Sequence, residues 1–164
     1  MRILGVDPGL KITGYGLIDA NEGQDSKIKL IEAGIIEPKP KDLLQDKLSK
    51  VYEILDEIIV QFSPQIMVLE KLYAHYNHPT TACILGHLRG VICLLCADRK
   101  LILAEHSVKR IRKAIVGQGG ANKLQTQRIV AHLLKINEED LTADASDALA
   151  LAIGYVQQLR FKVG

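Results

Sequence analysis

The chain has 164 residues, which is enough for one domain with a full hydrophobic core. Its hydrophobic fraction of 48% and charged fraction of 24% are those of an ordinary soluble globular protein, and its net charge of +2 indicates no class of partner by itself. The longest apolar run, around residues 84–97, is interrupted by His87 and Arg89, so we expect no membrane span. The first apolar run ends at Asp7 and is too short for a signal peptide.

The first half of the chain contains short apolar runs of strand type and one long amphipathic helix. Strands are predicted at Arg2–Asp7, near Thr13–Asp19 and at Lys27–Glu37. The helix is predicted over Lys41–Phe62, because apolar residues recur there every three or four positions. A further strand, Gln65–Glu70, follows it.

The second half is mainly helical. Helices are predicted from Pro79 to about Arg99, around Val108–Val116, at Asn122–Lys135 and over about Asp144–Leu159, with a short strand at Leu101–Glu105. Three consecutive strands, followed by strands that alternate with helices, predict an α/β fold. We expect a mixed five-stranded sheet flanked by helices, in a single domain that spans residues 1–164.

The three cysteines, Cys83, Cys93 and Cys96, all fall in one apolar helical stretch. Cys93 and Cys96 have the spacing of a redox pair or of half a zinc site, but no second pair follows. We therefore expect the cysteines to pack in the core of a reduced, cytoplasmic protein.

Four acidic residues have the placement that a metal-dependent nuclease requires. Asp7 and Glu70 each end a predicted buried strand, and a helical crossover between parallel strands would bring both to the same edge of the sheet. Asp144 and Asp147 are three residues apart and therefore share one helical face. Grouped carboxylates repel one another, and a hard divalent cation with oxygen ligands removes that cost.

Each acid also suits a purely structural role when it is taken singly. Asp7 precedes Pro8 and Gly9 and has the position of a turn residue, and Glu70 has that of the first solvated residue after a strand. Asp144 and Asp147 suit a helix N-cap and a first-turn acid. Their joint placement on two strand ends and one helix favours the metal site.

A basic segment lies between residues 107 and 137, which contain no Asp or Glu. A patch of one sign in a nearly neutral chain indicates a polyanion as partner, although a solvated helical face is the alternative. The Lys and Arg residues of this segment are Lys109, Arg110, Arg112, Lys113, Lys123, Arg128 and Lys135.

Several motifs together resemble the RuvC family of Holliday-junction resolvases, over essentially the whole chain. Residues 5–16 (GVDPGLKITGYG) resemble the opening motif of that family. Glu70 followed by Tyr73, residues 116–119 (VGQG) followed by Lys123, and residues 144–150 (DASDALA) match in order and spacing. The resemblance implies a ribonuclease-H-like fold and a homodimer that places paired, symmetric nicks in strands of like polarity at a four-way DNA junction, in homologous recombination and DNA repair.

Carried over by position, the resemblance implies that Asp7, Glu70, Asp144 and Asp147 are the catalytic, metal-binding set, with Asp7 bridging the metals. It implies two Mg²⁺ ions per active site, with Mn²⁺ as a substitute, and products with 5′-phosphate and 3′-hydroxyl ends. It also implies the branch-migration proteins RuvA and RuvB as partners, and no membrane.

Residues that contact DNA are expected from two sources. Tyr73 stands where the family usually has a Phe that stacks on unpaired bases, and a tyrosine stacks as well. Arg112 and Lys123 match basic positions that meet the DNA backbone, whereas Lys109 and Lys113 are expected from charge alone.

Two alternatives remain open at this stage. One is a nuclease of the same fold that trims RNA precursors, although such chains are usually shorter. The other is a junction-binding module without catalysis, which the presence of all four acids disfavours. An actin-like or sugar-kinase ATPase needs a second domain, for which 164 residues leave no room.

Overall fold

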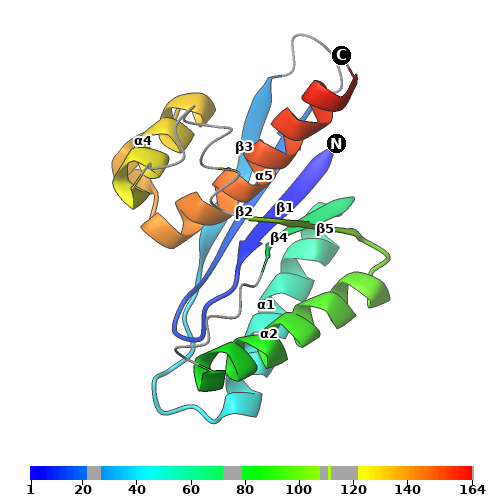
Figure 1. Ribbon diagram of the computed structural model, residues 1–164, viewed down its shortest axis with the longest axis vertical. Coiled ribbons are helices and arrows are strands. Elements are labelled where there is room, and N and C mark those ends of the chain that lie inside the picture. Colours follow the sequence, from blue (N-terminus) through cyan, green and yellow to red (C-terminus); the bar gives the residue numbers. More distant parts are fainter. Residues whose placement is uncertain (22–26, 72–78, 108–110, 112–121, 164) are drawn as a thin grey trace.

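A mixed five-stranded sheet forms the centre of the molecule (Figure 1). The computed structural model describes residues 1–21, 27–71, 79–107, 111 and 122–163, and side chains as far as residue 159. The strands lie in the order β3-β2-β1-β4-β5. Their bounds are Arg2–Asp7 for β1, Thr13–Ala20 for β2, Ile28–Ile36 for β3, Ile66–Glu70 for β4 and Ile102–His106 for β5.

The pairing of the strands confirms the expected mixed sheet. β1 runs antiparallel to β2, and β2 antiparallel to β3, whereas β4 runs parallel to both β1 and β5. The β1–β4 register places Val6 opposite Leu69. The next residues, Asp7 and Glu70, therefore end neighbouring strands at the same edge.

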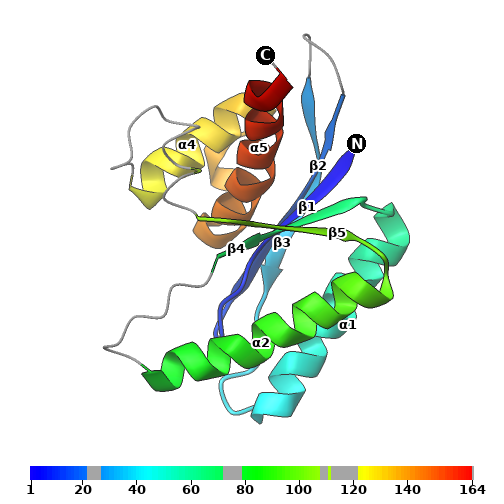
Figure 2. The ribbon, with the colours of Figure 1, turned by 45° about the vertical axis from the view of Figure 1, so that its right-hand side comes forward.

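Helices cover both faces of the sheet (Figures 1 and 2). The helices α1 (Leu44–Phe62) and α2 (Pro79–Asp98) lie on one face, and α4 (Lys123–Leu134) and α5 (Ala143–Val163) lie on the other. A short 3₁₀ helix, η1 (Glu138–Asp140), connects α4 to α5 and was not expected from the sequence.

Alternation of side chains along the strands divides the core into two clusters. Ile3 and Val68 point to the α5 face and pack in a cluster with Leu149. Leu4 and Leu69, one residue further along, point to the opposite face and pack in the cluster that includes α1 and α2. Asp7 lies four residues after Ile3, and Glu70 lies two residues after Val68. Their side chains therefore point to the same face as those two residues, the α5 face.

Helix α1 begins at Leu44 and not at Lys41 as predicted. The Asp42 carboxylate accepts the Lys39 N–H, and the Asp42 N–H donates to the Lys39 carbonyl. These two bonds close a turn before the helix, in the way that aspartate competes with helical hydrogen bonding. The basic helix predicted around residues 108–116 lies outside the described residues, apart from Ile111, which is fully buried.

One prediction about α2 is wrong in part, and another stays a prediction. By length and composition alone α2 would be able to cross a membrane, but core helices of soluble proteins pass the same test, so the expectation of no membrane span stays a prediction. Within α2, only 22% of the most apolar 18-residue stretch is buried in the protein. Of the cysteines that were expected in the core, Cys96 is buried with its thiol against the Met67 sulfur, but Cys83 is exposed.

Candidate active site

Asp7 and Glu70 meet at the carboxyl edge of β1 and β4. Their side chains share a hydrogen bond, which requires one of the two carboxyl groups to hold a proton. This contact between residues 63 positions apart in the sequence is the one that parallel pairing of the two strands predicts. The two acids therefore form a single carboxyl pair on the α5 face of the sheet.

The pKa of Asp7 is raised from its ordinary value of 3.8 to about 8. Burial is the largest cause, followed by the hydrogen bond and the charge of Glu70 and by the charge of Asp147. The positive charge of Lys123 acts in the opposite direction. In the protein without metal, these surroundings therefore disfavour the charged form of Asp7.

Helix α5 carries the second pair of acids. Thr142 caps the helix: its hydroxyl accepts the Ala145 N–H, and its carbonyl accepts the Ser146 N–H. The structural alternative that made Asp144 an N-cap is therefore wrong, and the carboxylates of Asp144 and Asp147 are left for other contacts. Asp147 is almost fully buried, with 4% of its side chain exposed, and Asp144 is half-buried.

Glycines allow α5 to approach the sheet closely enough to bring its acids to Asp7. Gly14 is opposite Asp7 in the β1–β2 ladder. A Cβ atom at Gly14 would lie 2.1 Å from the Asp144 carbonyl oxygen, a distance that no side chain tolerates. The glycine-rich β1–β2 segment is therefore a packing surface for the first turn of α5, as well as a turn signal.

Lys123 joins the two acids of α5. Its ammonium nitrogen lies 3.4 Å from Asp144 Oδ1 and 3.5 Å from Asp147 Oδ2. Partial burial acts to lower the pKa of Lys123, but the charges of Asp147 and Asp144 outweigh it and raise that pKa above its ordinary value. A capping box formed by Asn122 and Gln125 begins α4 at Lys123 and so determines where this ammonium lies.

The donor set suits a hard divalent cation, because all four groups offer carboxylate oxygens. Among the described residues, however, no three or more His, Cys, Asp or Glu side chains are placed so that they could hold a metal ion. The acids instead form two pairs, Asp7 with Glu70 and Asp144 with Asp147, and a proton and the Lys123 ammonium offset their charges. A cation bound between the pairs would take over both tasks.

Of the residues expected to contact DNA, only Lys123 lies in the part of the chain that the structure describes. Tyr73, Lys109, Arg112 and Lys113 lie outside the described residues. Lys123 is described: its ammonium contacts Asp144 and Asp147, and more than half of its side chain is exposed.

Sequence reasoning missed two contributors to the site. Thr142 caps α5 one residue before the predicted motif begins. Arg89 was noted only as an interruption of an apolar run, but it donates to the Glu70 carbonyl and to the Glu105 carboxylate. The isolated charge in an apolar helix was the signal that was available.

A mixed five-stranded sheet with helices on both faces, and a carboxylate cluster at the carboxyl ends of β1 and β4, defines an α/β protein of the ribonuclease-H-like class. The family model described as crossover junction endodeoxyribonuclease RuvC matches residues 3–155. The chain belongs to the RuvC family of crossover junction endodeoxyribonucleases, which are metal-dependent hydrolases.

Relatives and solved structures agree with this assignment. The chain is 38% identical over 162 residues to the Finegoldia magna crossover junction endodeoxyribonuclease RuvC, covering 99% of this chain and 96% of the relative. It is 37% identical over 151 residues to the Rhodopirellula baltica protein of the same name, covering 92% and 83%.

Two structures of Thermus thermophilus RuvC share the fold. The first has a TM-score of 0.85 at 19% identity, and the second, a complex with a Holliday junction substrate, has a TM-score of 0.86 at 17% identity. Each comparison covers 98% of this chain and 96% of the other.

Proposed function

We propose that this chain resolves Holliday junctions as a structure-selective endonuclease, in homologous recombination and DNA repair. It places paired, symmetric nicks in two strands of like polarity, and the nuclease domain spans residues 1–164. The observation that carries the proposal is the convergence of Asp7, Glu70 and Asp147 at one sheet edge in a chain of the RuvC family.

The catalytic groups in this proposal are Asp7 and Glu70 from the strands and Asp144 and Asp147 from α5, which together hold the metal. Held by these carboxylates, two divalent cations, Mg²⁺ or Mn²⁺, would supply an activated water and charge stabilisation for phosphodiester hydrolysis with 5′-phosphate and 3′-hydroxyl ends. Asp147 is buried and Asp7 is partly buried, which limits the contact of two of the four carboxylates with water. This strengthens their attraction for a cation relative to an exposed site.

Lys123 has two tasks in this account. In the protein without metal, its ammonium compensates Asp144 and Asp147 and keeps both side chains in place. More than half of the Lys123 side chain is exposed, so the ammonium is able to turn towards a DNA phosphate when a cation replaces it between the acids. Tyr73, Lys109, Arg112 and Lys113 complete the proposed DNA contacts.

The proposed assembly is a homodimer, since two opposed strands are to be cut symmetrically. Helix α2 supports this assignment, because Gly86 and Gly90 have nothing within 4 Å of their Cβ positions and Leu94 is exposed. These residues follow one another at intervals of four and form an open, apolar helix face of the kind that a second helix covers. RuvA and RuvB are proposed as further partners, and the cytoplasm as the compartment.

The proposal is tested by cleavage of a synthetic four-way DNA junction in Mg²⁺. Matched linear duplex, single-stranded RNA and a junction sample with EDTA are the comparisons. Nicks at symmetric positions in the junction alone support the proposal. Cutting of RNA instead would favour an RNA-processing nuclease, and junction binding without any cutting in Mg²⁺ or Mn²⁺ would favour a non-catalytic module.

A further inference from the structure

Arg89 is a nearly buried charge in an otherwise apolar helix. It lies in α2 next to the buried Leu88, and 14% of its side chain is exposed. Removing a guanidinium from water is costly unless its donors are satisfied. One Arg89 nitrogen, Nη1, donates to the Glu70 backbone carbonyl and the other, Nη2, donates to the Glu105 carboxylate.

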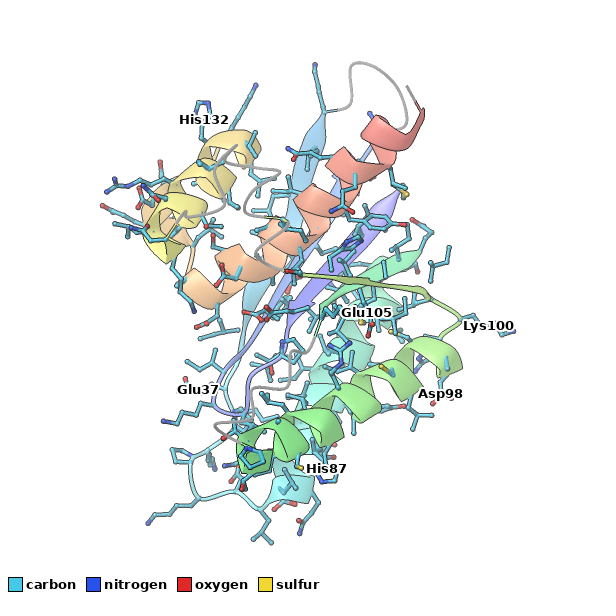
Figure 3. The ribbon with its side chains drawn as sticks, viewed as in Figure 1. Glu37, His87, Asp98, Lys100, Glu105 and His132 are labelled. Carbon is cyan, nitrogen blue, oxygen red and sulfur yellow. The ribbon has the colours of Figure 1, made fainter. Side chains whose placement is uncertain are left out.

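These two contacts reach β4 and β5 at their carboxyl ends. Glu105 is the penultimate residue of β5, and Glu70 is the last residue of β4. Figure 3 shows Glu105 near the centre of the molecule, whereas Lys100, at the other end of β5, lies at the periphery. Arg89 thus contacts the sheet at the edge that holds the acids and not at the turn that leads into β5.

Arg89 approaches Glu70 from the side opposite to the acid cluster. Leu103 shares the parity of Glu105 and packs with the cluster that includes α1 and α2, so Glu105 points to that face. The Glu70 side chain leaves the sheet on the α5 face, where it meets Asp7. Arg89 therefore bonds the Glu70 backbone from the α1–α2 side of the sheet. It does not contact the carboxylates of the acid cluster on the α5 side.

At Glu70, strand pairing restrains the end of β4 on the β5 side only. The β1–β4 register extends to the Val6–Leu69 pair, and Glu70 lies one residue beyond it. On the other side, β5 holds the end of the strand through the Lys71 N–H, which donates to the His106 carbonyl. The bond from Arg89 to the Glu70 carbonyl adds a second restraint on the backbone that carries the Glu70 side chain.

An arginine suits this position better than a lysine. Its planar fork offers separate donors in a fixed geometry, so one side chain bonds a carbonyl and a carboxylate together. A lysine ammonium keeps the charge but lacks the fork. The pair with Glu105, which is 44% exposed, contributes little to stability by itself.

We infer that Arg89 is a positioning residue for the nuclease reaction: by bonding the Glu70 carbonyl and Glu105, it fixes the Glu70 end of β4 so that the Glu70 carboxylate meets Asp7 in the geometry that binds metal. This inference rests on the proposed function for the identity of the reaction. It assigns a role to a residue that contacts neither the substrate nor the metal.

Four variants test the inference. Arg89→Gln removes both the guanidinium group and its charge, and Arg89→Lys keeps only the charge. Glu105→Gln keeps an acceptor oxygen for the arginine and is the conservative partner variant. Arg99→Gln is the matched control, because Arg99 makes a two-bond pair with Asp56 at the far end of α2.

The measurements are kcat for junction cleavage, junction affinity in EDTA, oligomeric state, and direct Mn²⁺ binding by electron paramagnetic resonance without DNA. For Arg89→Gln we expect kcat to fall about 10- to 100-fold, the cost of a small misplacement of a catalytic group. We expect Mn²⁺ binding to weaken while junction affinity and oligomeric state are unchanged. Arg89→Lys is expected to be intermediate, and Glu105→Gln and Arg99→Gln to behave as wild type.

Two results would overturn the inference while wild type cuts the junction. One is wild-type kcat and Mn²⁺ binding in Arg89→Gln. The other is a loss of junction affinity or of the oligomer that accounts for the whole fall in kcat. A wild-type protein that cuts no junction, but binds Mn²⁺ more tightly than Arg89→Gln, would contradict the proposed function and still support the positioning role.

Discussion

Gly5 of β1 lies directly against Ala148 of α5: a Cβ atom at Gly5 would be 2.0 Å from the Ala148 carbonyl oxygen. The contact is with helix backbone, which has no rotamer by which to move aside. Gly5 precedes Asp7 by two residues on the same face of β1, and Ala148 follows Asp147. This contact therefore sets the separation between Asp7 and the acids of α5.

Gly5→Ala is expected to push α5 away from the sheet. We expect a loss of unfolding free energy of about 1–3 kcal/mol, which is typical of overpacking, and a larger loss of junction cleavage than of stability. Chemical denaturation and single-turnover cleavage measure the two effects. Gly34→Ala on β3 is the control, because its added methyl group meets only the tip of the Tyr15 side chain, which is able to shift. Equal effects of the two substitutions would contradict the account.

Much of this arrangement was predictable from the sequence. Apolar runs and helical spacing located the five strands and the described long helices to within about four residues. The approach of Asp7 to Glu70 followed from the rule that neighbouring parallel strands end at one edge. The close packing of Gly5 and Gly14 against α5 did not follow, because a glycine within a predicted strand does not show which element packs against it.

Contacts between distant side chains were not predictable. Lys123 was expected to face DNA, but its ammonium lies between Asp144 and Asp147, a contact that depends on how α4 crosses α5. Arg89 had no visible partner in the sequence, since Glu70 and Glu105 become neighbours only when β4 and β5 pair. The sequence pattern of a single helix or strand does not show which side chains of other elements it will meet in the fold.

The stability of the metal-free protein is expected to fall as the pH rises. The pKa of Asp7 is about 8 in the folded protein and ordinarily 3.8, so the folded state binds the extra proton between these values. The stability that this proton provides is fully present below about pH 4 and is lost as the pH rises to about 8.

Asp7→Asn tests this dependence because an amide does not ionise. In EDTA, we expect the variant to lose less stability than wild type between pH 5 and about 8.5, and to be the more stable of the two at the upper end. Each unit by which the pKa is raised corresponds to about 1.4 kcal/mol. Unfolding free energies measured across this pH range for both proteins provide the check, and parallel curves would contradict it.

Lys123→Met is expected to tighten metal binding in the absence of DNA. The ammonium competes with a divalent cation for Asp144 and Asp147, and because more than half of the Lys123 side chain is exposed, its pairing is worth about 0.5–1 kcal/mol, or about twofold to fivefold in affinity. Mn²⁺ titration by calorimetry measures the effect. Arg128→Gln, on the same helix as Lys123, removes a pair with Glu138 of η1 and is the control. Weaker Mn²⁺ binding in Lys123→Met would show that the lysine supports the metal instead of competing with it.

The homodimer is tested at Leu94, which is 58% exposed on the open face of α2. Leu94→Glu introduces a charge into the proposed interface and is expected to shift the protein from dimer to monomer in sedimentation equilibrium. Val60→Glu on α1 is the matched control, because Val60 is 60% exposed and lies on another helix. A monomeric wild type, or an equal effect of the two substitutions, would place the interface elsewhere or remove it.

The most direct test of the central claim is cleavage and binding of a four-way DNA junction by Asp7→Asn beside wild type. The account predicts that the variant binds the junction with wild-type affinity but cuts it at least about 1,000-fold more slowly, because the fold survives while the metal loses a ligand. Asp46→Asn, at an exposed acid in the first turn of α1, is expected to cut normally. Junction cutting by Asp7→Asn at a rate near that of wild type would contradict the assignment of the acidic edge as the active site.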